Sequence, residues 1–279
     1  GRRVAGVEVE RNGEVLTVEA PLVVVSCGAI NSAALLLRSA TVRHPDGLAT
    51  SSGLVVRRYM AHLATMMQGF HPFKRNATVF QKTVAINDFY LQGPGGFPLG
   101  QIQSQGRTHA IMAKTVGDTW RYKFLEMRHI PLWAYDQWVR RATDWLAMTE
   151  DLPRPDNRVT IAPDGRIRLV YRPNNVQAHA RLVEELRRIL GALGYWSPKI
   201  FAHSTGARNT THQCGTLVFG TDPAASVLDP FCRTHDVENL FVVDASFFPS
   251  SAAVNPALTI IAQALRVAGH IRTNDLKGQ

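Results

Sequence analysis

Hydrophobic and polar positions near the N-terminus alternate with a period of two. Residues 4–10 and 14–20 carry this alternation on either side of Asn12-Gly13. Asn-Gly is the strongest short signal for a tight hairpin turn, because both positions accept a positive φ. The pattern therefore predicts a β-hairpin over residues 4–20.

Two later segments are apolar without alternation: "PLVVVSCGA" at 21–29 and "NLFVVDAS" at 239–246. Unbroken runs of this length are typical of strands buried on both faces of a parallel sheet. A helix capped by Asn31 should follow the first run. A second helix should follow the other run, with Asn255 at its N-cap and Pro256 as its first residue. This order predicts part of a doubly wound α/β domain.

The middle of the chain has a different pattern. "NRVTIAPDGRIRLVYR" at 157–172 indicates another hairpin around Asp164-Gly165, and 176–194 has apolar residues at helical spacing up to Gly194. Antiparallel strands with helices on one side predict an α+β domain inserted into the α/β domain. The predicted boundaries are 1–55 and 212–279 for the α/β domain and 56–211 for the inserted domain.

Composition narrows the class of protein. Of the 279 residues, 45% are hydrophobic and 19% charged, which is a globular mixture. The net charge of +9 is dispersed along the chain, so we expect an anionic cofactor or substrate and no nucleic-acid partner. No run of 18 apolar residues occurs, so no transmembrane segment is expected. The three cysteines are irregularly spaced and are expected to be free thiols.

A group of histidines and cysteines raises the possibility of zinc. His212 and Cys214, with Cys232 and His235, offer the two nitrogens and two sulfurs that a structural zinc site uses. The usual Cys-x2–4-Cys spacing is missing, and a predicted turn lies inside one ligand pair. We therefore assign no metal ligands and keep a zinc-stabilised binding module as an alternative.

Three polar residues are candidates for chemistry. His212 adjoins a Cys-Gly-Thr turn and Asn255 precedes a proline, and each also suits a plain structural role. Asp244 is more specific. An acid at the carboxyl end of a buried parallel strand lies where open α/β sheets bind ligands.

The segments around these residues resemble a known family. "HQCGTLVFGTDP", "SVLDPFCRTHDVENLFVVDASFFPSS" and "VNPALTIIAQALRVAGHI" are similar in order and spacing to the C-terminal signature of the glucose–methanol–choline (GMC) flavoprotein oxidoreductases. "VVVSCGAINSAALLLRS" and "GLATSSGLVVRRYMAH" resemble the family's middle segments.

The resemblance implies an FAD-binding Rossmann-like domain and a substrate-binding domain. It also implies oxidation of an alcohol, such as a sugar or polyol, by hydride transfer to flavin N5. The family's catalytic histidine falls on His212 and its partner on Asn255, as in the His/Asn subgroup. Its FAD contacts fall on Gly28, Ala29, Asp244, Ala245, Asn255, Pro256 and Ala257. Oxygen, a quinone or a cytochrome remain open as electron acceptor, and the cytoplasm or periplasm as compartment.

One family motif is not found in the chain. The dinucleotide fingerprint G-x-G-x-x-G is missing, and "GPGG" at Gly93 neither follows a buried strand nor opens a helix. The chain also begins inside a predicted strand without a starting methionine. We therefore expect it to be the C-terminal portion of a longer polypeptide whose N-terminal segment carries the fingerprint. The alternative is a non-catalytic subunit that completes a flavoprotein in trans.

Overall fold

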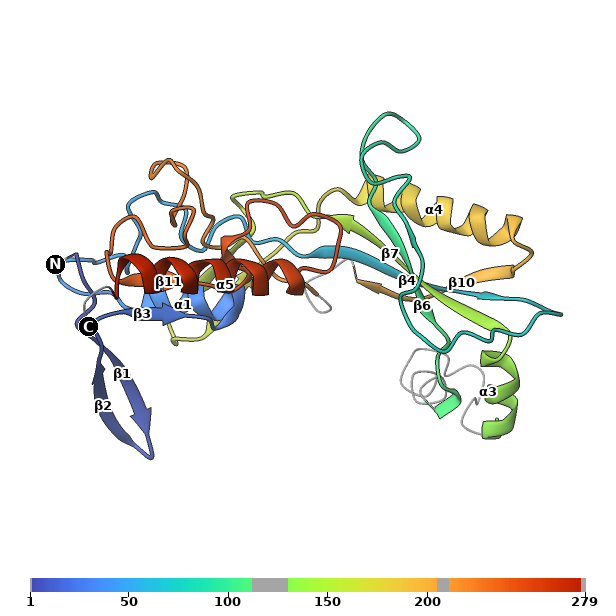
Figure 1. Ribbon diagram of the computed structural model, residues 1–279, viewed down its shortest axis with the longest axis horizontal. Coiled ribbons are helices and arrows are strands. Elements are labelled where there is room, and N and C mark those ends of the chain that lie inside the picture. The colour runs from blue at the N-terminus through green and yellow to red at the C-terminus, as the bar shows by residue number, and fades with distance from the viewer. Residues whose placement is uncertain (1, 112–129, 205–210, 277–279) are drawn as a thin grey trace. The chain divides into compact units, whose positions relative to one another are not determined.

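The computed structural model describes residues 2–111, 130–204 and 211–276 (Figure 1). It mixes helices and strands and divides into two compact units. The first contains Gly1–His62, Asp151–Asn174 and Gly206–Gln279, and the second contains Leu63–Glu150 and Asn175–Thr205. Within the described ranges, none of the helices has the length and apolar character needed to cross a membrane.

The first unit begins with the predicted hairpin. Asn12 and Gly13 both have positive φ, 55° and 83°, as a two-residue turn requires. The elements of this unit are β1 (Gly6–Arg11), β2 (Glu14–Glu19), β3 (Val23–Val25), α1 (Gly28–Arg38), β8 (Arg158–Ile161), β9 (Ile167–Val170), β11 (Leu240–Val242), η3 (Ala245–Phe247) and α5 (Ala257–Asn274).

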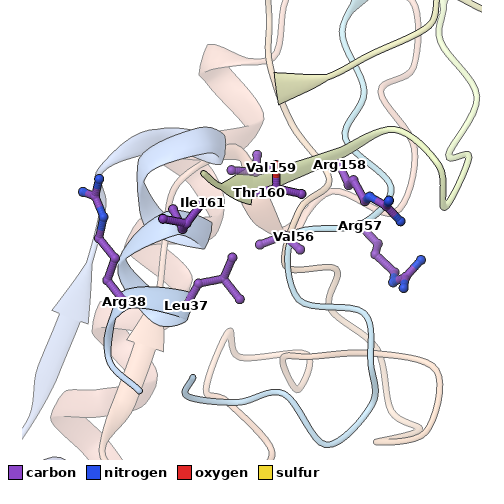
Figure 2. Close-up of a pocket in the computed structure, with 8 residues that line it drawn as sticks. All are labelled: Leu37, Arg38, Val56, Arg57, Arg158, Val159, Thr160 and Ile161. Atoms are coloured by element: carbon purple, nitrogen blue, oxygen red, sulfur yellow. The ribbon is translucent and has the colours of Figure 1, made fainter. Parts of the chain in front are cut away.

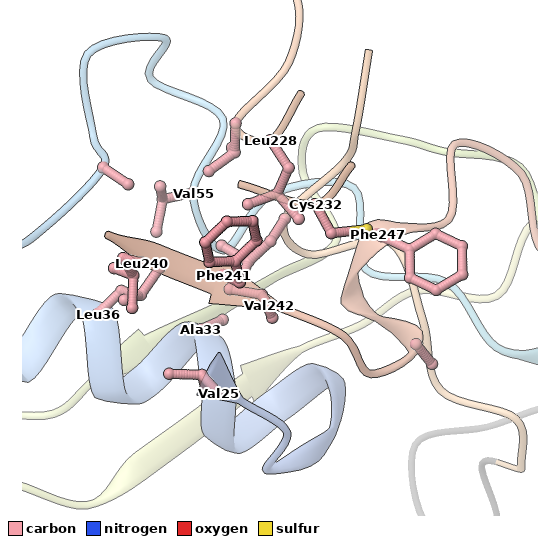
Figure 3. Close-up of a cluster of buried hydrophobic side chains, with 14 of the residues drawn as sticks. Val25, Ala33, Leu36, Val55, Leu228, Cys232, Leu240, Phe241, Val242 and Phe247 are labelled. Carbon is pink, nitrogen blue, oxygen red and sulfur yellow. The ribbon is translucent and has the colours of Figure 1, made fainter. Parts of the chain in front are cut away.

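The two apolar runs form strands as predicted, and these strands pair with each other. β3 and β11 lie parallel, with Val24 opposite Phe241. Phe241 is fully buried and packs in a cluster with residues of α1 and of the loop that precedes β11 (Figure 3). Val24, however, is 47% exposed, so burial on both faces is wrong at this position. Successive side chains of a strand point to opposite faces, and Val25 takes the face that meets the core.

Both helices start at residues other than those predicted. α1 begins at Gly28, so Asn31 lies inside the helix and does not cap it. The carboxylate of Asp244 accepts a hydrogen bond from the Gly28 N–H and replaces that cap. α5 begins at Ala257 with Pro256 as its N-cap, one residue later than expected. The side-chain amide of Asn255 lies against His212.

The hairpin around Gly165 forms as predicted but belongs to the first unit. β8 and β9 pair antiparallel, and Val159 of β8 is completely buried in the same cluster as Phe241. The Val159 N–H donates to the carbonyl of Val56 at 3.0 Å. The segment Asp151–Asn174 lies in the first unit, whereas the prediction placed it in the inserted domain, 56–211. The apolar residues of this segment pack on α1 and on the residues around α1.

The second unit is a five-stranded sheet with helices. Its strands have the order β10-β4-β7-β6-β5, and β4 pairs antiparallel with β10, as β6 does with β5 and β7. The predicted amphipathic helix is α4, which packs on β7, β10 and β6 through Leu182, Leu186 and Leu190. The elements are β4 (His62–Phe70), β5 (Ala85–Ile86), β6 (Gln101–Gly106), α3 (Leu132–Val139), β7 (Ala142–Glu150), α4 (Val176–Ala192) and β10 (Trp196–Ser204).

Candidate active site

Backbone pairing places two histidines opposite each other in the first unit. Met60 and Cys214 form an antiparallel bridge, with N–H to carbonyl distances of 3.0 and 2.9 Å. His62 follows Met60 by two residues, and His212 precedes Cys214 by two. In an antiparallel pair these two positions lie opposite each other. Their Nδ1 atoms lie 2.7 Å apart, and the rings meet edge to face at 74°.

A glycine makes this pairing possible. Gly215 has φ +89°, and a Cβ there would lie 2.6 Å from the Arg58 carbonyl oxygen and 2.5 Å from the Met60 methyl. The next residue, Thr216, donates its hydroxyl to the carbonyl of Ala29 at 2.6 Å. The Cys-Gly-Thr turn therefore ties the His212 segment to the start of α1.

The structure also brings His212 and Asn255 together. Although 43 positions separate them in sequence, the Asn255 amide nitrogen lies 3.4 Å from His212 Nε2. His212 has a left-handed backbone, φ 57°, which is uncommon for a residue with a side chain and is typical of functional sites. A cavity of about 310 Å³ is lined by residues of the segment that leads to α5, among them Phe248, Ser251 and Pro256.

Sequence reasoning missed His62 and its support. The His62 side chain is 1% exposed, and its Nε2 lies 2.9 Å from the carbonyl oxygen of Ser251. The Ser251 hydroxyl accepts from the Asp151 N–H at 3.0 Å and donates to the Asp151 carbonyl at 3.1 Å. The sequence signal that could have pointed to His62 was a histidine as the first residue of an apolar strand, "HLATMMQGF".

His212, His62 and Ser251 form a hydrogen-bonded series, which we call the His212 network. A buried acid, Asp151, lies next to it. Asp151 is fully buried, and its carboxylate accepts from the Ala61 N–H at 3.2 Å and from the Tyr171 hydroxyl. Burial raises the pKa of Asp151 to about 6, although these hydrogen bonds oppose the rise. Burial, together with the charge of Asp151, also raises the pKa of Tyr171 well above its usual value.

The raised pKa of Asp151 predicts a pH-dependent stability. The unfolded chain releases this proton near pH 3.8 and the folded chain near pH 6. Between these values the folded state binds more protons, so stability should fall as pH rises through the window. Relative to Asp151→Asn, the native protein should lose on the order of 3 kcal/mol of unfolding free energy between pH 4 and 7.

Urea unfolding of both proteins across this pH range measures the effect. Asp156→Asn is the matched control, because the Asp156 side chain is 78% exposed. An unfolding free-energy difference between native protein and Asp151→Asn that stays constant with pH would contradict the burial explanation.

The residues predicted to contact a cofactor form a second cluster. Asp244 follows β11, and its carboxylate accepts from the Gly28 N–H at 3.0 Å and from the Ser246 N–H at 2.8 Å. It also accepts from the hydroxyls of Ser32 and Ser246. These four donors match the four lone-pair sites of a carboxylate, so any contact of Asp244 with a ligand must use its backbone.

The backbone at Gly28 leaves open space for a ligand on one side. Gly28 has φ +83°, and a Cβ at this position would have no atom within 4 Å. Because the Gly28 N–H already donates to the Asp244 carboxylate, a ligand at the start of this 11-residue helix would meet open backbone and not the Gly28 N–H. Ala257, the first residue of α5, is also exposed and offers a second helix N-terminus.

A larger cavity in the first unit contains none of the predicted site residues. Its volume is about 440 Å³, and Figure 2 shows Arg57 and Arg158 pointing to the same side of it. The lining residues are Leu37, Arg38, Val56, Arg57, Arg158, Val159, Thr160 and Ile161. This cavity is therefore separate from the His212 network.

Three of the four residues that suggested zinc make other side-chain contacts. His212 meets His62, His235 Nε2 lies 2.9 Å from the Ser226 hydroxyl, and Cys232 Sγ accepts from the Gln263 amide at 3.3 Å. All three cysteines are free thiols, as expected. In the part of the chain that the structure describes, no three His, Cys, Asp or Glu side chains are grouped as a metal would need.

Comparisons with known proteins agree on one family. Residues 153–264 match the family model described as GMC oxidoreductase. The chain is 33% identical over 287 residues to 6'''-hydroxyparomomycin C oxidase of Streptomyces lividus, covering 95% of this chain and 47% of that protein. It is 32% identical over 262 residues to paromamine 6'-oxidase of Streptomyces fradiae, covering 88% and 44%.

A solved structure shows the same fold. Pyridoxine 4-oxidase from Mesorbium loti superposes with a TM-score of 0.62 at 20% identity, covering 98% of this chain and 56% of that one. The chain thus spans about half the length of the proteins that it matches. Sequence and fold together show that the chain belongs to the GMC oxidoreductase family.

Proposed function

We propose that the protein containing this chain oxidises the CH–OH group of a sugar, polyol or similar alcohol, with FAD as its cofactor. The observation that carries the proposal is the approach of His212 Nε2 to the Asn255 amide at 3.4 Å. Membership in the GMC oxidoreductases supports it. So do two relatives named as oxidases, one of them acting on paromamine at its 6' position.

The chemistry needs a base and a donor at one oxygen atom. Moving a proton outright from an alcohol, with a pKa of about 16, to a histidine near 6.5 would cost about 13 kcal/mol. His212 Nε2 accepts the hydroxyl proton as the hydride leaves carbon, and the resulting imidazolium stabilises the negative charge on oxygen. Asn255 donates its amide to the same oxygen and orients the C–H bond.

FAD, when bound, supplies the acceptor for the hydride. The backbone of Gly28 and Ala29 at the start of α1 would contact the cofactor, and the fingerprint expected in the N-terminal segment would hold its diphosphate. The start of α5, at Pro256 and Ala257, would place partial positive charge near the ring that gains electrons. Asp244 would act mainly by fixing the turn at Gly28, because protein donors occupy its carboxylate.

Absorbance of the full-length gene product tests the proposal. We expect a flavin spectrum that loses its visible bands when a suitable alcohol is added without oxygen. A panel of sugars, polyols and simple alcohols should include at least one that does so. Stoichiometric zinc and unfolding by a chelator would support the binding module instead. A spectrum that forms only after mixing with a separate chain would support the subunit acting in trans.

A further inference from the structure

His62 holds hydrogen-bond partners at both ring nitrogens. Its Nε2 lies 2.9 Å from the carbonyl oxygen of Ser251, and its Nδ1 lies 2.7 Å from Nδ1 of His212. A carbonyl oxygen only accepts, so His62 Nε2 must carry a proton. In the neutral ring this leaves a lone pair on His62 Nδ1, which faces His212.

The proton on His62 fixes the proton on His212. Two nitrogens 2.7 Å apart form a hydrogen bond only if one of them carries the hydrogen. Since His62 Nδ1 has the lone pair, His212 Nδ1 donates. The neutral His212 ring then has its lone pair on Nε2, the atom that lies 3.4 Å from the Asn255 amide nitrogen. An amide N–H can donate to that lone pair.

The Ser251 carbonyl, the last acceptor in this series of hydrogen bonds, is itself held in place. Ser251 is 2% exposed, and its hydroxyl forms hydrogen bonds to both the N–H and the carbonyl of Asp151. The Ser251 carbonyl therefore stays aimed at His62. The backbone pairing at Met60 and Cys214 holds the two histidines in register.

We infer that His62 is a positioning residue that selects the His212 tautomer with its lone pair on Nε2. This inference rests on the proposed function of His212 as the base. In the other tautomer Nε2 would carry a hydrogen and could not accept the hydroxyl proton. After proton transfer the His212 imidazolium keeps its Nδ1–H bond to His62, so no proton has to leave His62 during the reaction.

Two near-isosteric variants of the full-length flavoprotein separate positioning from packing. In His62→Asn, the side-chain oxygen can take the place of Nδ1 and still accept from His212. In His62→Gln, the amide can reach the Ser251 carbonyl but offers no acceptor to His212. We expect His62→Gln to lower kcat by roughly 10- to 100-fold, below the roughly 10⁴-fold loss caused by a fully wrong tautomer. KM should change little, and His62→Asn should recover most of the loss.

A spectroscopic readout checks the tautomer directly. Nitrogen-15 resonances of histidine-labelled protein distinguish a protonated ring nitrogen from one with a lone pair, and His212→Gln identifies the His212 signals. We expect Nδ1 of His212 to be protonated in the native protein and in His62→Asn. In His62→Gln the proton should shift toward Nε2.

Two results would overturn the inference. One is a native His212 with its proton on Nε2, and the other is equal kcat and equal tautomers in His62→Gln and His62→Asn. Failure of the proposed function has a different signature. In that case no alcohol would bleach the flavin of the native protein, while the nitrogen-15 spectra would still report on His62.

Discussion

If the proposed function is correct, replacing His212 with alanine should slow flavin bleaching by an alcohol about 10²- to 10⁴-fold, which is the usual contribution of a positioned general base. The residue also stabilises the charge that develops on the substrate oxygen, so the loss should lie toward the upper end of this range. The visible flavin spectrum should persist, because the predicted FAD contacts lie at the starts of α1 and α5. Anaerobic stopped-flow absorbance of the full-length variant measures the rate.

His235→Ala is the control for removing a histidine from the same unit. His235 contacts the Ser226 hydroxyl at 2.9 Å and has no place in the His212 network, so its loss should leave the bleaching rate nearly unchanged. Equal rates for native protein and His212→Ala, with flavin bound in both, would refute the role of His212 as base. Loss of flavin from His212→Ala would instead show that His212 supports the cofactor site.

Elements set by local chemistry were predictable from sequence. Asn12-Gly13 and Gly165 lie in turns between alternating segments, and the apolar spacing of Leu182, Leu186 and Leu190 defines a helical stripe. Each of these signals operates within a few residues of chain. The continuous apolar runs also identified β3 and β11 as strands, whereas their pairing with each other was seen only in the structure.

The differences arise where distant segments decide the outcome. Asn31 is an acceptable helix cap by itself, but the carboxylate of Asp244, from far along the chain, caps the Gly28 N–H first. Val159 fits an inserted domain by local pattern, yet its burial in the same cluster as Phe241 places β8 in the first unit. Neither of these long-range contacts can be predicted from the local sequence.

The candidate site also contains residues that the sequence predicted and one that it did not. His212 and Asn255 could be named because their motifs resemble those of a family. His62 could not, because its place opposite His212 depends on the register of the bridge between Met60 and Cys214. Register between segments about 150 positions apart is set by packing and by one glycine, Gly215.

Replacing that glycine should have the largest effect on stability. In Gly215→Ala, the left-handed backbone costs roughly 1–2 kcal/mol for a residue with a side chain. The new Cβ would also overlap the Arg58 carbonyl oxygen, which belongs to the backbone and cannot rotate away, and this adds roughly 1–3 kcal/mol. We expect a total loss of about 2–5 kcal/mol, measured by urea unfolding of the full-length protein.

Gly165→Ala separates the two causes. Gly165 has φ +78° and lies in the same unit, but a Cβ there meets no atom within 4 Å, so only the backbone cost applies. The excess loss in Gly215→Ala measures the overlap with Arg58 and Met60. Because that overlap pushes apart the segments that carry His62 and His212, Gly215→Ala should also slow flavin bleaching, whereas Gly165→Ala should not. Equal losses of stability in the two variants would mean that the turn at Gly215 moves freely, and the register that joins the histidines would then need another cause.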